Sequence, residues 1–221
     1  MFETKDFARD REAMIDRQLR RRGIRDPQVL EAFARVPREA FVALEYRDSA
    51  YGDHPLPIPA GQTISQPYIV ALMIEAARIG SQSRVLEVGA GSGYAAAVIS
   101  RIARDVVAIE RYSELAEFAR ERCSTLGFDN VEIVTGDGTR GCPDKAPFDA
   151  ILVAASGPEV PGSLVTQLVP GGRLVIPLGT VNGIQQLVRA TKCDDGTVTR
   201  DSLGAVRFVP LIGQEGWDGD V

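Results

Sequence analysis

The hydrophobic and polar positions of this 221-residue chain follow two different rhythms. In its first part the apolar residues recur at helical spacing, as at Leu30, Phe33 and Ala34. Glycine and proline interrupt this pattern at Gly23 and at residues 26–27. The segment before residue 47 is therefore predicted to form helices that break at these two points.

A proline-rich stretch separates this helical part from the rest of the chain. Residues 51–61 contain three prolines and end in Ala60-Gly61, so this stretch is predicted to be a loop. An apolar helix should begin near Pro67, because proline in a first helical turn loses only a donor that is already unpaired.

From Ser83 onward, short apolar runs alternate with helical patterns. Apolar runs of this kind are typical of a parallel sheet that helices cover on both faces. We therefore expect an α/β fold, Rossmann-like, with a mostly parallel sheet and a helical N-terminal extension. Strands are predicted at 85–88, 106–109, 131–134, 150–153 and 173–176, the last after a turn at 170–172, and two closing antiparallel strands at 185–189 and 206–209.

The whole chain is predicted to be one domain with three parts. Residues 1–80 form the helical extension and an active-site loop, residues 81–180 the cofactor-binding core, and residues 181–221 the closing strands and tail. The tail after Leu211 has no recognisable pattern, and we expect a frayed terminus there.

Composition and charge exclude several other classes of protein. A net charge of −5 argues against nucleic-acid and membrane-surface partners, which would favour clustered Lys and Arg. The basic cluster at residues 17–22 is best explained as a solvated helix face. No apolar run approaches a membrane span, and three scattered cysteines with one histidine do not suit a metal site. We expect a cytoplasmic monomer without a bound metal.

A glycine-rich loop follows the first predicted strand and is the main candidate for a cofactor site. Gly89, Gly91 and Gly93 alternate, and the sixth position is Tyr94 where a dinucleotide-binding loop would have glycine. A phosphate-binding loop is excluded because no Gly-Lys-Ser/Thr follows. Glu87 stands just upstream, where a carboxylate would disfavour a pyrophosphate but would favour the methionine ammonium of S-adenosylmethionine.

Two more carboxylates follow the next two strands. Glu110 ends the second strand, where a carboxylate can accept hydrogen bonds from both ribose hydroxyls of a nucleoside. Asp137 follows the third strand and could accept from the adenine amino group. Together with the loop they favour S-adenosylmethionine over a dinucleotide. The predicted cofactor-binding residues are Glu87, Gly89, Gly91, Ser92, Gly93, Glu110, Arg111, Asp137 and Gly138.

Six segments, in order along roughly residues 10–212, resemble the protein-L-isoaspartate O-methyltransferase family. They lie at 56–67, 85–94, 136–138, 146–151, 167–177 and 206–211. The resemblance implies methyl transfer from S-adenosylmethionine to the free α-carboxylate of L-isoaspartyl residues in damaged proteins and peptides. S-adenosylhomocysteine is the product, and the methyl ester initiates repair by closing to a succinimide.

The resemblance also assigns the active-site serine to Ser65, beside cofactor and substrate. From the residues alone, Ser65 would be read as an N-cap for the helix near Pro67, and both roles can coexist. A carboxylate acceptor is already ionised at neutral pH, so Ser65 is expected to align it rather than to move a proton. The substrate-binding residues implied are Ile58, Gln62, Thr63, Ile64, Ser65 and Val206.

Two alternatives remain open at this point. A related methyltransferase that modifies aspartate in one dedicated partner peptide would share these segments, although we would expect an added recognition segment. A nucleoside-binding module without catalysis would be expected to have lost Ser65 or the 61–67 block, and this chain keeps both.

Overall fold

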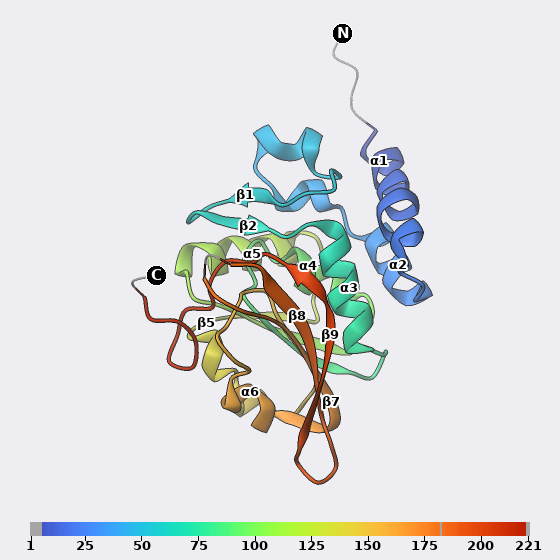
Figure 1. Ribbon diagram of the computed structural model, residues 1–221. Coiled ribbons are helices and arrows are strands. Elements are labelled where there is room, and N and C mark those ends of the chain that lie inside the picture. Colours follow the sequence, from blue (N-terminus) through green and yellow to red (C-terminus); the bar gives the residue numbers. More distant parts are fainter. Residues whose placement is uncertain (1–5, 182, 220–221) are drawn as a thin grey trace.

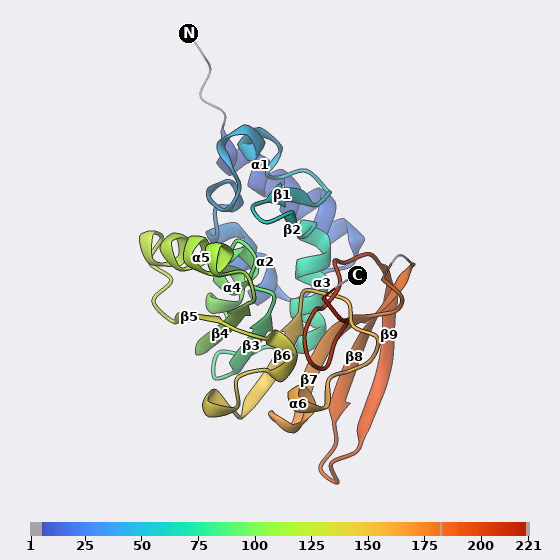
Figure 2. The same cartoon turned by 90° about the vertical axis from the view of Figure 1, so that its left-hand side faces the viewer.

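The computed structural model describes residues 6–181 and 183–219, which surround a central seven-stranded sheet (Figures 1 and 2). The strand order is β5-β4-β3-β6-β7-β8-β9. The strands from β5 to β7 are parallel, and β8 and β9 continue the sheet as antiparallel hairpins. The strands are β3 (Arg84–Val88), β4 (Asp105–Glu110), β5 (Val131–Thr135), β6 (Phe148–Val153), β7 (Leu168–Leu178), β8 (Gln185–Lys192) and β9 (Val198–Val206).

Helices cover the two faces of this sheet unevenly. Val85 and Ala150 face the larger apolar core, which the helices α1 to α5 supply. Leu86 and Ile151 face a smaller core, where Leu164 of α6 packs. The prediction of a mostly parallel sheet with helices is confirmed. No helix in the described ranges is long and apolar enough to cross a membrane. The main helices are α3 (Pro67–Ala77), α4 (Tyr94–Ser100), α5 (Ser113–Thr125) and α6 (Gly162–Thr166).

The N-terminal extension is helical and breaks where the sequence predicts. Helix α1 (Phe7–Met14) continues as a π-helical and then a 3-10 segment that ends at Gly23, whose φ is 107°. Helix α2 (Pro27–Arg35) follows, and the Asp26 side chain caps it by accepting from the backbone N–H of Gln28. Two short 3-10 segments, Arg38–Phe41 and Leu44–Ser49, lead to the hairpin.

The proline-rich stretch is a loop at residues 51–55 and a turn at 59–61, but the loop prediction was wrong for residues 56–58, which form a strand. Strands β1 (Leu56–Ile58) and β2 (Gln62–Ile64) pair as an antiparallel hairpin above the sheet. Its turn places Ala60 and Gly61 at positive φ, 57° and 65°. Prolines are compatible with such strands because a two-stranded hairpin has open edges, where no ladder donor is required.

The last closing strand also lies earlier than predicted. It is β9, which ends at Val206, whereas residues 207–209 leave the sheet. The surface of β9 is mostly exposed and polar, so it lacks the apolar alternation that marks a strand. The apolar run after it has another cause: Phe208 and Val209 pack against the two cores as the chain folds back over the strand ends.

The predicted turn at residues 170–172 lies inside β7. The ladder with β6 pairs Phe148 with Leu168 and resumes at Ala150 and Arg173, so the intervening residues bulge out of register. Gly171 adopts a φ of 75° in this bulge, a conformation that glycine reaches without steric cost. The glycines therefore mark an irregularity within one long strand.

The described part of the tail is docked, so the expectation of a frayed terminus was wrong for residues 212–219. The indole N–H of Trp217 donates to the backbone oxygen of Ser156 at 2.9 Å, and the backbone N–H of Gln214 donates to the Asp137 carboxylate at 2.9 Å. Glu215 accepts from the backbone N–H of Ser163 at 3.0 Å. These contacts join the tail to the segments that follow β5 and β6 and to helix α6. Residues 220–221 lie outside the described ranges.

Candidate active site

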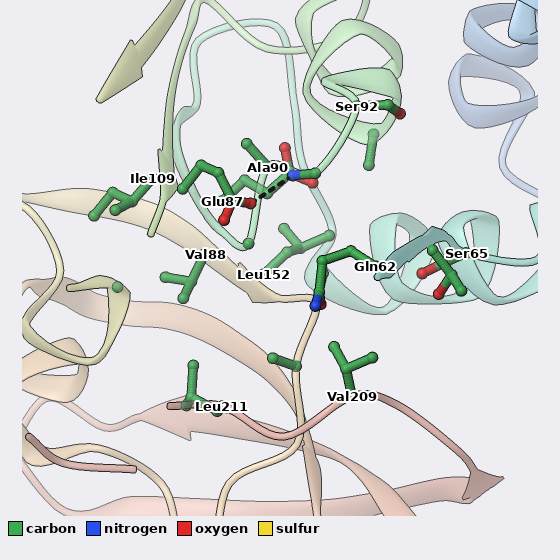
Figure 3. Close-up of a pocket in the computed structure, with 18 of the residues that line it drawn as sticks. Gln62, Ser65, Glu87, Val88, Ala90, Ser92, Ile109, Leu152, Val209 and Leu211 are labelled. Atoms are coloured by element: carbon green, nitrogen blue, oxygen red, sulfur yellow. Dashed lines mark hydrogen bonds between the residues drawn. The ribbon is translucent and has the colours of Figure 1, made fainter. Parts of the chain in front are cut away.

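A cavity opens where β3, β4 and β6 end, beside the hairpin (Figure 3). This is the point at which the strand order reverses, because β3 lies between β4 and β6. Ligands of open α/β sheets bind at such points. The cavity encloses about 990 Å³ when the open space at its mouth is included. Figure 3 shows Glu87 on the strand side, Gln62 and Ser65 on the hairpin side, and Val209 and Leu211 on the third side.

The glycine loop forms the floor of this cavity through unusual backbone angles. Gly89, Gly91 and Gly93 all have positive φ, at 88°, 54° and 85°. The Gly89 N–H donates to the oxygen of Ile109 at 2.8 Å, which ties the loop to β4. A side chain on Gly93 would place its Cβ 3.1 Å from the Cβ of Ala119 in α5. Gly89 and Gly91 line the cavity, whereas Gly93 lies behind it and permits close helix packing.

Glu87 is buried in the cavity wall with an unused hydrogen-bonding atom. The residue is 2% exposed, and its Oε2 has no partner among the described residues. Burial, and secondarily the charge of Glu110, raise the pKa of Glu87 to about 8. A buried carboxylate without a partner is costly unless a ligand cation completes it. Glu87 therefore fits the ammonium group of an amino-acid-bearing cofactor.

Glu110 closes β4 on the same side of the cavity. It is 5% exposed, and both carboxylate oxygens accept backbone hydrogen bonds. The N–H of Gly91 donates to Oε2 at 2.9 Å, and the N–H of Tyr112 donates to Oε1 at 3.0 Å. Each oxygen keeps a further lone pair, so the fixed carboxylate can accept from two ribose hydroxyls. Arg111 and Tyr112 also line this end of the cavity.

Asp137 does not reach the cavity, in contrast to the sequence-based expectation of a contact with adenine. Its Oδ1 accepts from the backbone and hydroxyl of Thr139, and its Oδ2 accepts from the backbone of Gln214. Burial acts to raise the pKa of Asp137, but these hydrogen bonds outweigh it and lower that pKa. The tail supplies one of these donors, so the sequence alone could not reveal this role. Gly138 does line the cavity, and a Cβ there would lie 2.5 Å from a methyl carbon of Val88.

A second, wider groove adjoins the cofactor cavity. It lies between α3 and the chain around the end of β9, with Tyr68 and Leu72 on one wall and Leu203 and Phe208 on the other. It encloses about 1730 Å³ including open solvent. The two spaces share a boundary, and the residues that line both are Thr63, Ser65, Ala154 and Val209.

Ser65 occupies this boundary at the end of β2. The N-cap of α3 is Gln66, without a side-chain cap hydrogen bond, so the capping role that Ser65 would have had from sequence alone is wrong. Within the described residues the Ser65 hydroxyl makes no hydrogen bond, and Gln66 instead donates to Asp53 at 2.7 Å. The hydroxyl is therefore available to a ligand that extends from one space into the other.

The structure brings most of the predicted substrate residues to these two spaces. Gln62, Thr63 and Ile64 line the cofactor cavity, and Val206 lines the groove. Ile58 lines neither, because it is buried under the glycine loop, 3.3 Å from the position of a Cβ on Gly91. Sequence reasoning missed several apolar lining residues that follow strand ends. These are Tyr112, Ala154, Pro210, Leu211 and Ile212, together with Leu152 near the end of β6.

Comparisons with known proteins agree with this geometry. The model of the protein-L-isoaspartate(D-aspartate) O-methyltransferase family matches residues 9–216. Protein-L-isoaspartate O-methyltransferase 2 of Pelobacter propionicus is 57% identical over 94% of this chain and 92% of its own length. A Koribacter versatilis protein-L-isoaspartate O-methyltransferase is 53% identical over 96% of this chain and 94% of its own length.

Solved structures show the same likeness. A structure titled protein-L-isoaspartate O-methyltransferase has a TM-score of 0.85 at 32% identity, covering 93% of this chain and 67% of that one. A putative protein-L-isoaspartate O-methyltransferase from Plasmodium falciparum, in complex with S-adenosyl-L-homocysteine, has a TM-score of 0.77 at 28% identity, covering 95% and 99%.

The fold and the site together define a methyltransferase with a Rossmann-like sheet and a nucleoside cofactor at its strand ends. Within that class the match is specific and covers nearly the whole chain. The chain belongs to the protein-L-isoaspartate(D-aspartate) O-methyltransferase family.

Proposed function

We propose that this enzyme transfers the methyl group of S-adenosylmethionine to the free α-carboxylate of L-isoaspartyl residues in damaged proteins and peptides. S-adenosylhomocysteine leaves as the second product. The ester then closes to a succinimide without the enzyme, because a methoxide leaves more readily from an ester than an oxide leaves from a carboxylate. Hydrolysis of that ring restores part of the normal aspartate. The observation that carries the proposal is the place of Ser65, on the boundary between the cofactor cavity and the groove.

The cofactor's place follows from the two buried carboxylates. Glu87 would pair with the ammonium of the methionine part, and Glu110 would accept from the ribose hydroxyls. Bound S-adenosylmethionine supplies an electrophilic methyl group on a sulfonium sulfur. Apolar side chains of Leu152 and Leu211 line the rest of the cavity and limit the access of water.

Ser65 then has to orient the acceptor rather than activate it. A free α-carboxyl group has a pKa of about 3.5 and is ionised at neutral pH, so no general base is required. The Ser65 hydroxyl donates to one carboxylate oxygen and leaves the other to face the methyl group. Alignment of the two reactants, together with removal of water, supplies the rate enhancement.

The decisive experiment compares two synthetic peptides that differ only in one linkage. One contains an L-isoaspartyl residue and its twin contains normal L-aspartate at the same position. We expect transfer of a labelled methyl group from S-adenosylmethionine to the isoaspartyl peptide alone. Equal labelling of both peptides would contradict the repair function, and labelling of neither would favour a dedicated partner peptide.

A further inference from the structure

The groove beside Ser65 carries an unusual charge for this protein. Two arginines, Arg22 and Arg207, line it, and the described residues of its lining include no aspartate or glutamate. The chain as a whole has a net charge of −5, so it would repel an acidic peptide at long range. The groove is therefore a local cationic site on an acidic protein.

Arg22 contributes little free charge to this site. It ends the basic cluster that the sequence suggests to be a solvated face, but its guanidinium lies over the ring of Tyr68, with Cζ 3.6 Å from the ring centroid. It also donates to the Asp53 carboxylate at 2.9 Å. Asp53 in turn accepts from the side chain of Gln66, the residue after Ser65. Asp53 largely offsets the charge of Arg22, and the pair holds one wall of the groove together.

Arg207 differs because it has no acidic partner within the described residues. Its side chain is exposed, and no ion pair among residues 6–181 and 183–219 involves it. Its backbone is nevertheless fixed from the next residue: Gln185, 1% exposed, accepts from the Phe208 N–H at 2.6 Å and donates to the Phe208 oxygen at 3.1 Å. The backbone of Arg207 is thus held at the groove wall opposite α3, and its guanidinium has no acidic partner among the described residues.

We propose that Arg207 is a specificity-determining residue that favours isoaspartyl substrates with an acidic side chain close to the isoaspartyl residue. This inference rests on the proposed function, since a peptide must occupy the groove. An exposed ion pair contributes at most about 1 kcal/mol, which corresponds to about fivefold in affinity. The preference belongs to peptide binding and not to the methyl transfer, so it changes KM and leaves kcat unchanged.

The test uses two isoaspartyl peptides that differ only in glutamate or lysine on both sides of the isoaspartyl residue. At low ionic strength we expect the glutamate peptide to have a KM about threefold to fivefold lower, with an equal kcat. Salt should reduce this ratio, because the pair is exposed to solvent. Arg207→Gln should bring the two KM values together. Calorimetric binding of both peptides in the presence of S-adenosylhomocysteine measures the same preference without any methyl transfer.

The matched control is Arg200→Gln, which removes the same charge from an exposed position of β9 that does not line the groove. It should leave the ratio as in the wild type. Equal KM values for the two peptides with the wild-type enzyme would overturn the inference, as would an equal effect of Arg200→Gln. A loss of affinity for both peptides alike in Arg207→Gln would also overturn it, because Arg207 would then bind the common isoaspartyl group. Failure of methyl transfer to both peptides, with the binding preference intact, would contradict the proposed function alone.

Discussion

The two spaces that meet at Ser65 are built in opposite ways. The cofactor cavity is formed by the ends of parallel strands, and its polar groups Glu87 and Glu110 are 2% and 5% exposed. The groove is formed by the flank of α3 and the chain around the end of β9, where Arg207 is exposed. The cofactor is always the same molecule, so its site can be buried and rigid. Damaged peptides differ in sequence, and a wide groove with one exposed cation suits such varied ligands.

Rigidity on the cofactor side has an energetic consequence. The Oε2 of Glu87 has no partner among the described residues, which destabilises the protein when the carboxyl is ionised. On the groove side, the Arg22–Asp53 pair is exposed and costs little to rearrange. Substitutions on the cofactor side should therefore have larger effects than substitutions on the groove side.

The largest effect is expected for Glu110→Ala. The change removes the acceptor for the N–H groups of Gly91 and Tyr112, and with it the acceptor that we propose for the ribose. Hydrogen bonds to a charged group contribute about 3 kcal/mol here, so the Kd for S-adenosylhomocysteine should rise about a hundredfold in calorimetry. Glu114→Ala, at an exposed position in the first turn of α5, is the control. An unchanged Kd for Glu110→Ala would remove Glu110 from the cofactor site.

Glu87→Gln should separate stability from binding. Between a pKa of 4.5 and a pKa of about 8, the native Glu87 keeps a proton that the unfolded chain has lost, so the free energy of unfolding falls as the pH rises through this window. The glutamine variant lacks this loss. The free energy of unfolding of the variant, relative to that of the wild type, should rise by about 2 kcal/mol from pH 6 to pH 8, or about 5 °C in Tm. Above the pKa of about 8 this difference should level off. Cofactor affinity should fall. A pH-independent difference in Tm would show that Glu87 does not titrate in this range.

Ser65→Ala should slow methyl transfer at the boundary between the two spaces without weakening cofactor binding. Loss of one aligning hydrogen bond should lower kcat about tenfold, while the Kd for the cofactor stays within twofold. Single-turnover transfer to an isoaspartyl peptide measures the first quantity and calorimetry the second. Ser202→Ala on the exposed surface of β9 is the matched control. An unchanged kcat would assign the alignment to another group.

The smallest effect is expected for Trp217→Phe. The variant keeps an aromatic ring but loses the N–H that donates to Ser156 at 2.9 Å. Loss of one hydrogen bond should lower the free energy of unfolding by about 1 kcal/mol and raise the cofactor Kd by less than threefold. Denaturant unfolding and calorimetry provide the two values. If Trp217→Phe raised the cofactor Kd more than Glu110→Ala, the docked tail would matter more for cofactor binding than the buried strand ends.

The sequence predicts the cofactor half well because its signals are local. The three central strands β3, β4 and β6 are short apolar runs, and Glu87 and Glu110 stand at fixed places within the first two. Burial of both strand faces forces this pattern into the residues themselves. The glycine loop likewise shows its backbone requirement as residue type, since positive φ at Gly89 and Gly93 favours glycine.

The remaining features depend on contacts between distant residues. Asp137 could not be placed from its neighbours, because Gln214, far along the chain, supplies one of its hydrogen-bond donors. Strand β9 has no apolar pattern because most of its surface is exposed. Arg22 could not be distinguished from the rest of a basic helix until Tyr68 and Asp53 were seen beside it.

The docked tail carries an intrinsic fluorophore. Trp217 is the only tryptophan in the chain, so it dominates the intrinsic fluorescence. Its indole N–H donates to the backbone oxygen of Ser156, and its backbone N–H donates to the oxygen of Leu211, which lines the cofactor cavity. Its emission maximum should therefore follow the docking of the tail, and a shift to longer wavelength would mark release into water. Docking of the tail can thus be followed in the unmodified enzyme, without an added dye.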